Sequence, residues 1–182
     1  DMGGTTAKVS VVEDGALHIS SDYEVGGGMN ATSPLINGGG YALNLPVIEI
    51  SEVGAGGGSL VWLDKAGALK VGPQSAGAMP GPACYGAGGE QATVTDANVV
   101  LGYLNPQALA GWAVPIEKKL AEEAVLKHVA EPLGRGLIET AFGIHGIANA
   151  NMMRAIKMVS TYRGRDPRDF ALMAFGGSGG VH

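Results

Sequence analysis

The first residues of the chain group the residue types that bind phosphate and Mg²⁺. Asp1 precedes Gly3 and Gly4, and Thr5 and Thr6 follow directly. Glycine lets a phosphate approach backbone N–H groups, hydroxyls add hydrogen bonds, and a carboxylate can hold Mg²⁺. The stretch predicts phosphate binding by Gly3, Gly4, Thr5 and Thr6, with Asp1 as a catalytic group and metal ligand. A turn-capping role for the Asp1 side chain is the structural alternative.

Further glycine clusters could complete such a site, because the chain holds 31 glycines that are grouped rather than periodic. Two clusters, at 54–58 and 176–180, each follow a segment with strand character. We expect these loops to contact a nucleotide cofactor through a set of small residues: Gly56, Gly57, Gly58, Gly176, Gly177, Ser178 and Gly179. For the first of the two loops, a tight connection between strands is an equal alternative.

The commoner nucleotide and metal fingerprints do not fit these loops. A G-x-G-x-x-G pattern would need glycine at Ser59 in one loop and at His182 in the other. The sequence contains no G-x-x-x-x-G-K-[ST] phosphate loop, and its Cys and His residues lack zinc-site spacing. A phosphate site of another class is therefore indicated.

Three residues elsewhere in the sequence, Asp96, Cys84 and His145, each allow a chemical and a structural interpretation. Asp96 is either catalytic or metal-binding, or it is the N-cap of the helix that follows. Cys84 has no sequence neighbour that would stabilise a thiolate, so a structural role is favoured. His145 lies on an apolar helix face, which favours a hydrogen-bonded core histidine over a ligand.

Three arginines fit a solvated helix end better than steering of an anionic substrate: Arg154, Arg163 and Arg165.

Strands must position the loops. Apolar segments bounded by turn residues predict hairpins around Asp14–Gly15 and around 64–67. A glycine-rich loop or flap is expected at 24–44, and an irregular loop at 72–89. The expected strands are 9–12, 16–19, 41–45, 47–53, 60–63, 68–71 and, as a buried strand, 170–175.

Helices are expected at three places along the second half of the chain. The first covers 97–104, with Asp96 or Thr95 as its N-cap. The second is an amphipathic surface helix over 116–133, and the third and longest covers 137–162. Strands followed by helices and a last strand predict a mixed α/β or α+β domain with helices packed on a twisted sheet.

Composition limits the classes of function. With 182 residues and 46% apolar residues, the chain can form one globular domain. The net charge of −5 argues against nucleic-acid binding, and no apolar run reaches the length of a membrane span. A single cysteine and no recognisable signal segment predict a cytoplasmic setting. Because the chain begins on one motif and ends after another, we expect a piece of a longer protein.

Six motifs, in order along the chain, together resemble the hydantoinase A/oxoprolinase family, which includes N-methylhydantoinase, 5-oxoprolinase and the nucleotide-binding subunits of acetone and acetophenone carboxylases. They are Asp1-Met2-Gly3-Gly4-Thr5-Thr6, Gly54-Ala55-Gly56-Gly57-Gly58-Ser59, 71–78, 80–86, Thr93-Val94-Thr95-Asp96-Ala97-Asn98 and 174–180. The chain departs from the commoner family pattern at two places. Lys8 stands where Asp is frequent, and Gly180-Val181-His182 replaces Pro-Leu-His.

The resemblance implies an actin-like, ribonuclease-H-like ATPase lobe that uses ATP and Mg²⁺. Residues 1–182 would form most of the second lobe, and the first phosphate turn would lie in an N-terminal lobe outside this chain. The implied activity is ATP-dependent ring opening of a cyclic amide, a hydantoin or 5-oxoproline, by phosphorylation of the amide oxygen. The alternatives are the nucleotide-binding subunit of an ATP-dependent ketone carboxylase and a non-catalytic nucleotide-binding module. A hydantoinase B-type subunit is an implied partner, and the isolated piece is expected to be inactive.

Overall fold

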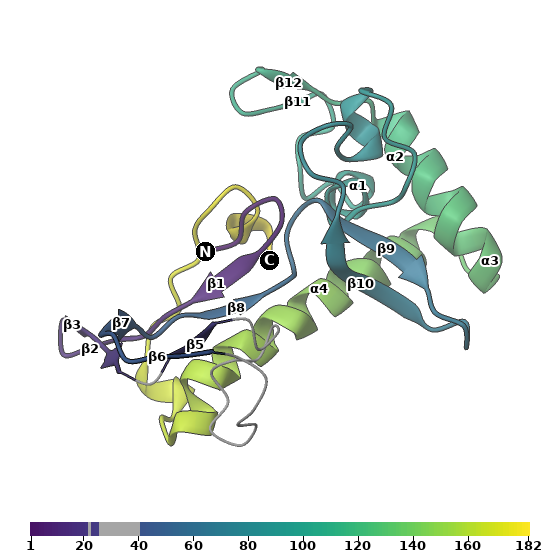
Figure 1. Ribbon diagram of the computed structural model, residues 1–182. Coiled ribbons are helices and arrows are strands. Elements are labelled where there is room, and N and C mark those ends of the chain that lie inside the picture. The colour runs from purple at the N-terminus through teal and green to yellow at the C-terminus, as the bar shows by residue number, and fades with distance from the viewer. Residues whose placement is uncertain (22, 26–40) are drawn as a thin grey trace.

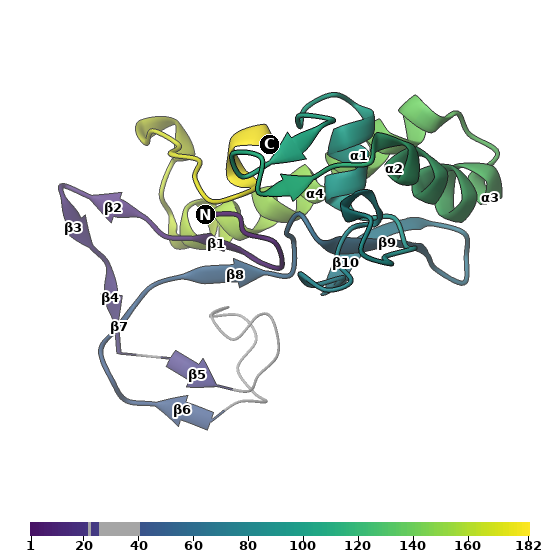
Figure 2. The ribbon, with the colours of Figure 1, turned by 90° about the horizontal axis from the view of Figure 1, so that it is seen from above.

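The structure, a computed structural model, describes residues 1–21, 23–25 and 41–182. Figure 1 shows an arm of short strands at one end and a helical part at the other, with the long helix α4 (Leu137–Val159) extending along both. This helix packs against strands β1, β8 and β10 and against helix α1. The first and last residues lie near each other in both ribbon views (Figure 1, Figure 2). Of the expected flap, residues 26–40 lie outside the described residues.

The described strands pair two by two, always antiparallel. The pairs are β1 (Ala7–Val9) with β8 (Ser51–Val53), β2 (Val12–Glu13) with β3 (Ala16–Leu17), β4 (Ile19–Ser20) with β7 (Val47–Ile48), β5 (Tyr23–Val25) with β6 (Tyr41–Leu43), β9 (Ser59–Leu63) with β10 (Leu69–Ser75), and β11 (Ala108–Leu109) with β12 (Val114–Pro115). The predicted mixed α/β class is confirmed. The described strands form six separate two-stranded ladders, and the glycine-rich loop at 54–58 lies between β8 and β9.

Both predicted hairpins are confirmed. Asp14 and Gly15 take φ values of 51° and 77°, the left-handed pair that a two-residue hairpin turn requires. The turn between β9 and β10 is held by the Asp64 carboxylate, which accepts hydrogen bonds of 2.9 Å from the amides of Ala66 and Ala68. β10 extends to Ser75, so the irregular loop predicted from residue 72 begins later.

Three predicted strands are each divided into two, and one of them is 16–19, which divides between Leu17 and Ile19. The segment 9–12 ends one strand at Val9 and begins another at Val12, and the segment 47–53 divides in the same way. At this corner both strands change partners, and Ser10 Oγ donates to the carbonyl of Glu49 at 3.0 Å. A side-chain hydrogen bond to the backbone replaces the ladder there.

The first helix, α1 (Val94–Val100), begins earlier than predicted. Its N-cap is Thr93, so the expectation of Asp96 or Thr95 as N-cap is wrong. The amide of Asp96 donates to Thr93 Oγ1, and the Thr93 amide donates to the Asp96 carboxylate. This reciprocal pair is a capping box, in which the acidic residue stands three positions inside the cap.

The remaining helices follow the sequence prediction closely. α2 (Lys118–Val125) continues through a π-helical turn at Leu126–Ala130 into α3 (Glu131–Leu133), and Gly134 ends the run with a φ of 64°. α4 ends at Val159, three residues before the predicted end, where Arg165 Nη1 donates to the Val159 carbonyl at 3.0 Å. Among the described residues, none of the helices combines the length and apolar character that crossing a membrane would require.

The buried strand predicted at 170–175 is wrong. No strand is assigned there, and Leu172 and Met173 are 76% and 80% exposed. Apolar composition alone cannot make a strand, because a strand needs a partner for its backbone groups. Only the last residue of the segment pairs with the chain start, through a 2.9 Å hydrogen bond from the Met2 amide to the Phe175 carbonyl.

An ionic cluster ties the strand arm to the end of α4. Glu49, only 8% exposed, lies 2.8 Å from Arg163 Nη2 and 3.6 Å from Arg165 Nη1. His18 Nδ1 lies 3.2 Å from the same carboxylate. Two of the arginines predicted to lie at a solvated helix end therefore pair with a buried acid.

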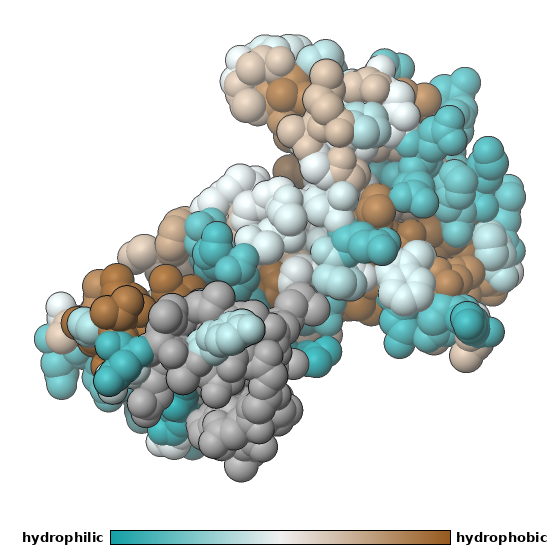
Figure 3. All heavy atoms as spheres, in the orientation of Figure 1, coloured by the Kyte–Doolittle hydropathy of each residue, from teal (hydrophilic) through white to brown (hydrophobic). Residues whose placement is uncertain are grey.

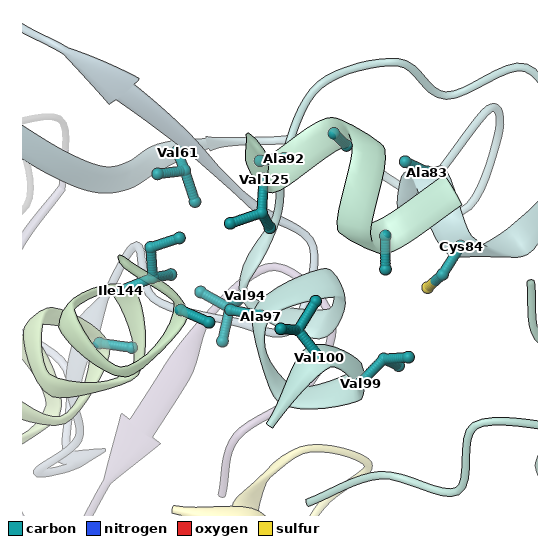
Figure 4. Packing of buried hydrophobic residues seen from close by; sticks show 14 of the residues in the cluster. Val61, Ala83, Cys84, Ala92, Val94, Ala97, Val99, Val100, Val125 and Ile144 are labelled. Atoms are coloured by element: carbon teal, nitrogen blue, oxygen red, sulfur yellow. The ribbon is translucent and has the colours of Figure 1, made fainter. Parts of the chain in front are cut away.

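The hydrophobic core lies where α1, α2, α4 and β9 meet. Figure 4 shows Val61, Val94, Val125 and Ile144 directed toward one another from these four elements. The side chains of Val94, Val125 and Ile144 have no exposed surface. This core fixes α1 relative to the strands that carry the glycine loops.

We expect Ile144→Ala to lower the free energy of unfolding by about 2–5 kcal/mol, because it leaves a cavity in this core. Chemical denaturation of the 182-residue chain measures the effect. Ile138→Ala is the matched control, since Ile138 is on the same helix and 59% exposed. Equal losses in the two variants would contradict the placement of the core.

Candidate functional site

Residues 1–6 form a tight turn that leads into β1. Asp1 and Lys8 exchange backbone hydrogen bonds of 2.8 and 2.9 Å, and the Gly3 amide donates to the Thr6 carbonyl at 3.0 Å. Among the described residues, the amide N–H groups of Gly4, Thr5 and Thr6 have no hydrogen-bond acceptor. Gly4 and Thr5 are exposed, so the tip of the turn presents unused donors to solvent.

The loop at 54–59 packs its backbone directly onto this turn. The amides of Gly57 and Gly58 donate to the carbonyls of Gly3 and Gly4 at 3.0 and 2.6 Å. A Cβ on Gly56 would lie 2.5 Å from Gly4 C and from Thr5 N, closer than real Cβ contacts. Glycine is needed here so that two backbones can touch.

The loop at 175–179 closes the other side of the turn. The Ser178 amide donates to the Met2 carbonyl at 2.9 Å, next to the bond between Met2 and Phe175. Gly176 has a φ of 93°, and a Cβ there would collide with the Asp1 carboxylate and the Met2 carbonyl. All three predicted loops therefore meet at one place, although they are far apart in sequence.

Figure 3 shows a pale, weakly polar surface in the middle of the molecule, between the brown patch on the strand arm and the helical part. The surface is notched between this region and the β11–β12 hairpin. Gly4 has open space beside it, since a Cβ added there would meet nothing within 4 Å. The same holds for Gly177.

Ser75, at the end of β10, is a site residue that our sequence analysis did not predict. Its hydroxyl lies 3.2 Å from Thr5 Oγ1 and accepts from the Gly77 amide at 3.1 Å. A Cβ on Gly58 would be 3.0 Å from the same hydroxyl. Ser75 belongs to the 71–78 motif, and this motif is the sequence feature that could have identified Ser75 as a site residue.

The N-terminal turn of α1 holds the 54–59 loop from behind. Thr95 donates to the carbonyl of Gly57 twice, from its amide at 2.7 Å and from its hydroxyl at 2.8 Å. A Cβ on Gly57 would lie 2.8 Å from Thr95 Oγ1 and 2.5 Å from Ser178 Oγ. Because Gly57 has no side chain, α1 and the 54–59 and 175–179 loops can meet at this position.

Asp96 is fully buried and its carboxylate is fully used. It accepts from the amides of Cys84 and Ala83 at 2.8 and 3.3 Å, and from the Thr93 amide and hydroxyl at 2.9 and 2.7 Å. These bonds fix the 83–85 turn against α1. The geometry favours a structural role for Asp96 over direct chemistry, as the capping-box partner of Thr93 and not as the N-cap.

Asp1 is exposed, and its carboxylate lies against Gly176 at the meeting point of the loops. Among the described residues, no group of three or more His, Cys, Asp or Glu side chains could hold a metal ion by itself. Lys8, which departs from the family pattern, points to Glu52 at 4.0 Å on the surface. A cation at Asp1 would need ligands beyond such a side-chain group.

Cys84 is buried beside Asp96, as the structural interpretation predicts. Desolvation and then the nearby carboxylate raise the pKa of its thiol far above the ordinary value. A neutral thiol at this position is not a nucleophile at neutral pH.

His145 takes part in a buried polar network that includes three residues outside the predicted site. His145 Nδ1 lies 2.9 Å from Asn98 Oδ1, and Asn98 Nδ2 lies 3.2 Å from His182 Nε2. His182 Nδ1 lies 2.8 Å from Asn149 Oδ1. The two imidazole rings stack with centroids 4.6 Å apart. The helix-face signal for His145 was correct, but its partners come from remote parts of the chain.

Comparison with known proteins agrees with this geometry. The structure of an ATP-dependent caprolactamase from Pseudomonas jessenii is 41% identical and superposes with a TM-score of 0.83, over the whole of this chain and 24% of that one. A nucleotide-free acetone carboxylase structure is 31% identical, with the same TM-score and the same coverage. The acetophenone carboxylase gamma subunit of Aromatoleum aromaticum is 42% identical over 183 residues, which is 100% of this chain and 23% of the relative.

The fold is therefore that of an actin-like ATPase lobe. A model of the hydantoinase/oxoprolinase family matches residues 1–182, and the chain belongs to this family. It spans about a quarter of the length of the curated relatives that it matches.

We expect Gly56→Ala to destabilise the chain by about 1–3 kcal/mol, because its Cβ must push apart two backbones that cannot both move. Gly146→Ala is the control, since a Cβ on this helical glycine meets nothing within 4 Å. That change should raise stability by roughly 0.5–1 kcal/mol. Denaturant midpoints of the two variants give the comparison, and a neutral Gly56→Ala would contradict the contact.

Stability should also fall as the solution is acidified. Burial, and then the neighbouring His145, lower the pKa of His182 to about 4, and burial lowers the pKa of His145. The unfolded chain therefore binds more protons than the folded one between pH about 6.5 and about 4, and stability decreases as the pH falls through that window.

Denaturation at pH 7 and pH 5 measures this loss. His182→Gln removes one of the two titrating rings, so its stability should depend less steeply on pH. A pH dependence in that variant as steep as in the natural sequence would assign the effect to other groups.

Proposed function

We propose that residues 1–182 form an ATP-binding lobe in which Gly3, Gly4, Thr5 and Thr6 receive a phosphate group. The observation that carries this proposal is the exposed turn whose amides at Gly4, Thr5 and Thr6 have no acceptor among the described residues. Consecutive free N–H groups in a turn form an anion-binding concavity. The hydroxyls of Thr5 and Ser75, 3.2 Å apart at its edge, add donors.

The other two loops complete the proposed site. Gly56, Gly57 and Gly58 shape it, because they set the turn at its position and leave no side chain in the way. The loop with Gly176, Gly177, Ser178 and Gly179 lies against Asp1 and Met2 and is proposed to contact the nucleotide.

Asp1 is the carboxylate that we propose for Mg²⁺ and catalysis. The Asp1 side chain is exposed at the site. One or two carboxylates together with phosphate oxygens are the usual ligands of Mg²⁺ in proteins, so a single exposed carboxylate fits this role. Asp96 enters the proposal as a positioning residue, since four hydrogen bonds already occupy its carboxylate. Mg²⁺ would supply charge neutralisation for the transferring phosphoryl group.

For the full-length protein we propose ATP-dependent hydrolysis of a cyclic amide. Transfer of the terminal phosphoryl group to the amide oxygen forms an O–P bond and releases ADP. Water attacks the activated ring carbon, and collapse of the adduct breaks the C–N bond, protonates the ring nitrogen and leaves an acyl phosphate on the opened chain. A second water hydrolyses this acyl phosphate to a carboxylate and inorganic phosphate. The family membership and the caprolactamase likeness support this choice.

The second candidate is a subunit of an ATP-dependent ketone carboxylase. The acetone and acetophenone carboxylase relatives favour it, and the same phosphoryl transfer to a ketone enol oxygen would prepare the carbon for carboxylation. A nucleotide-binding module without turnover is the third. In each case we propose that a further lobe of the protein supplies the other phosphate turn, and that a hydantoinase B-type subunit is a partner.

We expect Gly4→Ala to weaken binding of Mg·ATP by about ten- to a hundredfold in the full-length protein, because the methyl group would occupy the place of a phosphate. The variant should keep its stability, since nothing lies within 4 Å of the added Cβ. Calorimetric titration with Mg·ATP gives the affinity, and Gly146→Ala is the matched control. Unchanged affinity in a folded Gly4→Ala protein would refute the phosphate turn.

The substrate class is tested by ATP consumption of the full-length protein with its partner subunit. We expect ADP formation to depend on caprolactam, 5-oxoproline or a hydantoin and to match the ring-opened product. ADP formation that needs acetone or acetophenone with bicarbonate would establish the second candidate instead. Binding of ATP without turnover on either class would support the third.

A further inference from the structure

The network of Asn98, His182, Asn149 and His145 lies outside the proposed phosphate turn, yet it ends in the loop that borders it. Asn98 is on α1, His145 and Asn149 are on α4, and His182 follows the short helical turn Gly179–Val181. Asn98 is 1% exposed and His145 is 9% exposed. Asn149 and His182 are partly buried. Nothing in the phosphate chemistry requires these four residues, so their clustering needs another explanation.

The hydrogen bonds assign donor or acceptor roles to three ring nitrogens of His145 and His182. The Asn98 amide nitrogen can only donate, so His182 Nε2 must be an acceptor. His182 Nδ1 therefore carries the proton and donates to Asn149 Oδ1. His145 Nδ1 likewise donates to Asn98 Oδ1. The His182 ring is therefore neutral, and burial lowers the pKa of His145; the two rings stack at an interplanar angle of 9°.

The network is connected to the site by a very short piece of chain. The helical turn Gly179–Val181 has Ser178 as its N-cap, and the Ser178 amide donates to the Met2 carbonyl beside the 1–6 turn. Ser178 Oγ is also so close to Gly57 that a Cβ added to this glycine would lie only 2.5 Å from it. Moving the His182 ring would therefore move the loop that touches both other glycine loops.

α1 is the element that makes the connection rigid. Its residues Thr95 and Asn98 are one turn apart, and Thr95 holds the 54–59 loop while Asn98 holds His182. The helix is buried along its whole length. The 54–59 and 176–179 loops, far apart in the sequence, thus take their relative position from one helix.

We propose that Asn98, acting through His182, is the positioning residue that holds the 176–179 loop against the 1–6 turn and thereby sets the affinity for nucleotide. The effect on affinity rests on the proposed function, whereas the effect on the loop does not. Neither residue needs to touch the nucleotide. Its role is to remove the freedom of the loop before binding, so that the ligand does not have to order it.

The first test compares Asn98→Ala with Asn151→Ala in the full-length protein. Asn151 is a matched control because its side-chain amide bonds the Val71 carbonyl from α4, at 3.3 Å, and does not contact the 176–182 segment through any recorded hydrogen bond. We expect Asn98→Ala, and not Asn151→Ala, to speed amide hydrogen exchange of residues 176–181 in the nucleotide-free protein. The same variant should bind Mg·ADP about tenfold more weakly.

The second test separates the hydrogen bond from the bulk of the ring. The side-chain oxygen of His182→Gln can reach the position of Nε2 and accept from Asn98, whereas the shorter His182→Asn reaches only toward Asn149. We expect His182→Gln to keep most of the exchange protection and Mg·ADP affinity, and His182→Asn to resemble Asn98→Ala. A purely packing role predicts the same loss in both.

The outcomes are distinct. If Asn98→Ala leaves exchange at 176–181 and Mg·ADP affinity at the natural values, the positioning role is refuted. If both asparagine variants change them equally, the effect is general destabilisation and the role is again refuted. A full-length protein that binds no nucleotide would refute the proposed function, while the exchange comparison would still decide whether Asn98 positions the loop.

Discussion

The contact between two glycine backbones is the constraint on which the rest of the site depends. Gly57 and Gly58 donate to the carbonyls of Gly3 and Gly4, and Gly56 lies against the same turn with no room for a methyl group. Carbonyls that accept these bonds face the interior, so the amides at the tip of the turn face outward. The orientation of the free donors is thus a consequence of close packing, and not of the turn sequence alone.

The short helix α1 extends that constraint to the rest of the molecule. Four polar side chains on or next to it are buried, and each bonds a different partner or completes the cap: Thr93, Thr95, Asp96 and Asn98. Buried polar groups are tolerated when every one is bonded, and then they specify one arrangement. The apolar side of the helix belongs to the core with Val125 and Ile144. α1 therefore couples the stability of the core to the geometry of the loops.

The sequence predicted those features whose physical cause is local. The Asp14–Gly15 hairpin, the amphipathic helix around 116–133 and the three glycine loops each depend on a few adjacent residues, and the structure contains them. The 170–175 strand was wrong because an apolar run does not contain its partner strand. Asp96 was misplaced as a cap because an acidic residue also favours the third helical position, where it completes a capping box with Thr93. The pairing of Asn98 with His182 could not be predicted, because nothing local in either segment specifies a partner 84 positions away.

The wide separation of the three loops along the chain has a consequence for biosynthesis. Their contacts join residues near positions 3, 57 and 178, so they have high contact order and form after local hairpins and helices. A ribosome delivers these segments one after another, at about 5–20 residues per second. Until residues 175–178 emerge, the Met2 amide and carbonyl lack their partners on that loop. The contacts between the 1–6 turn and the 175–179 loop can therefore form only after residue 178 has left the exit tunnel.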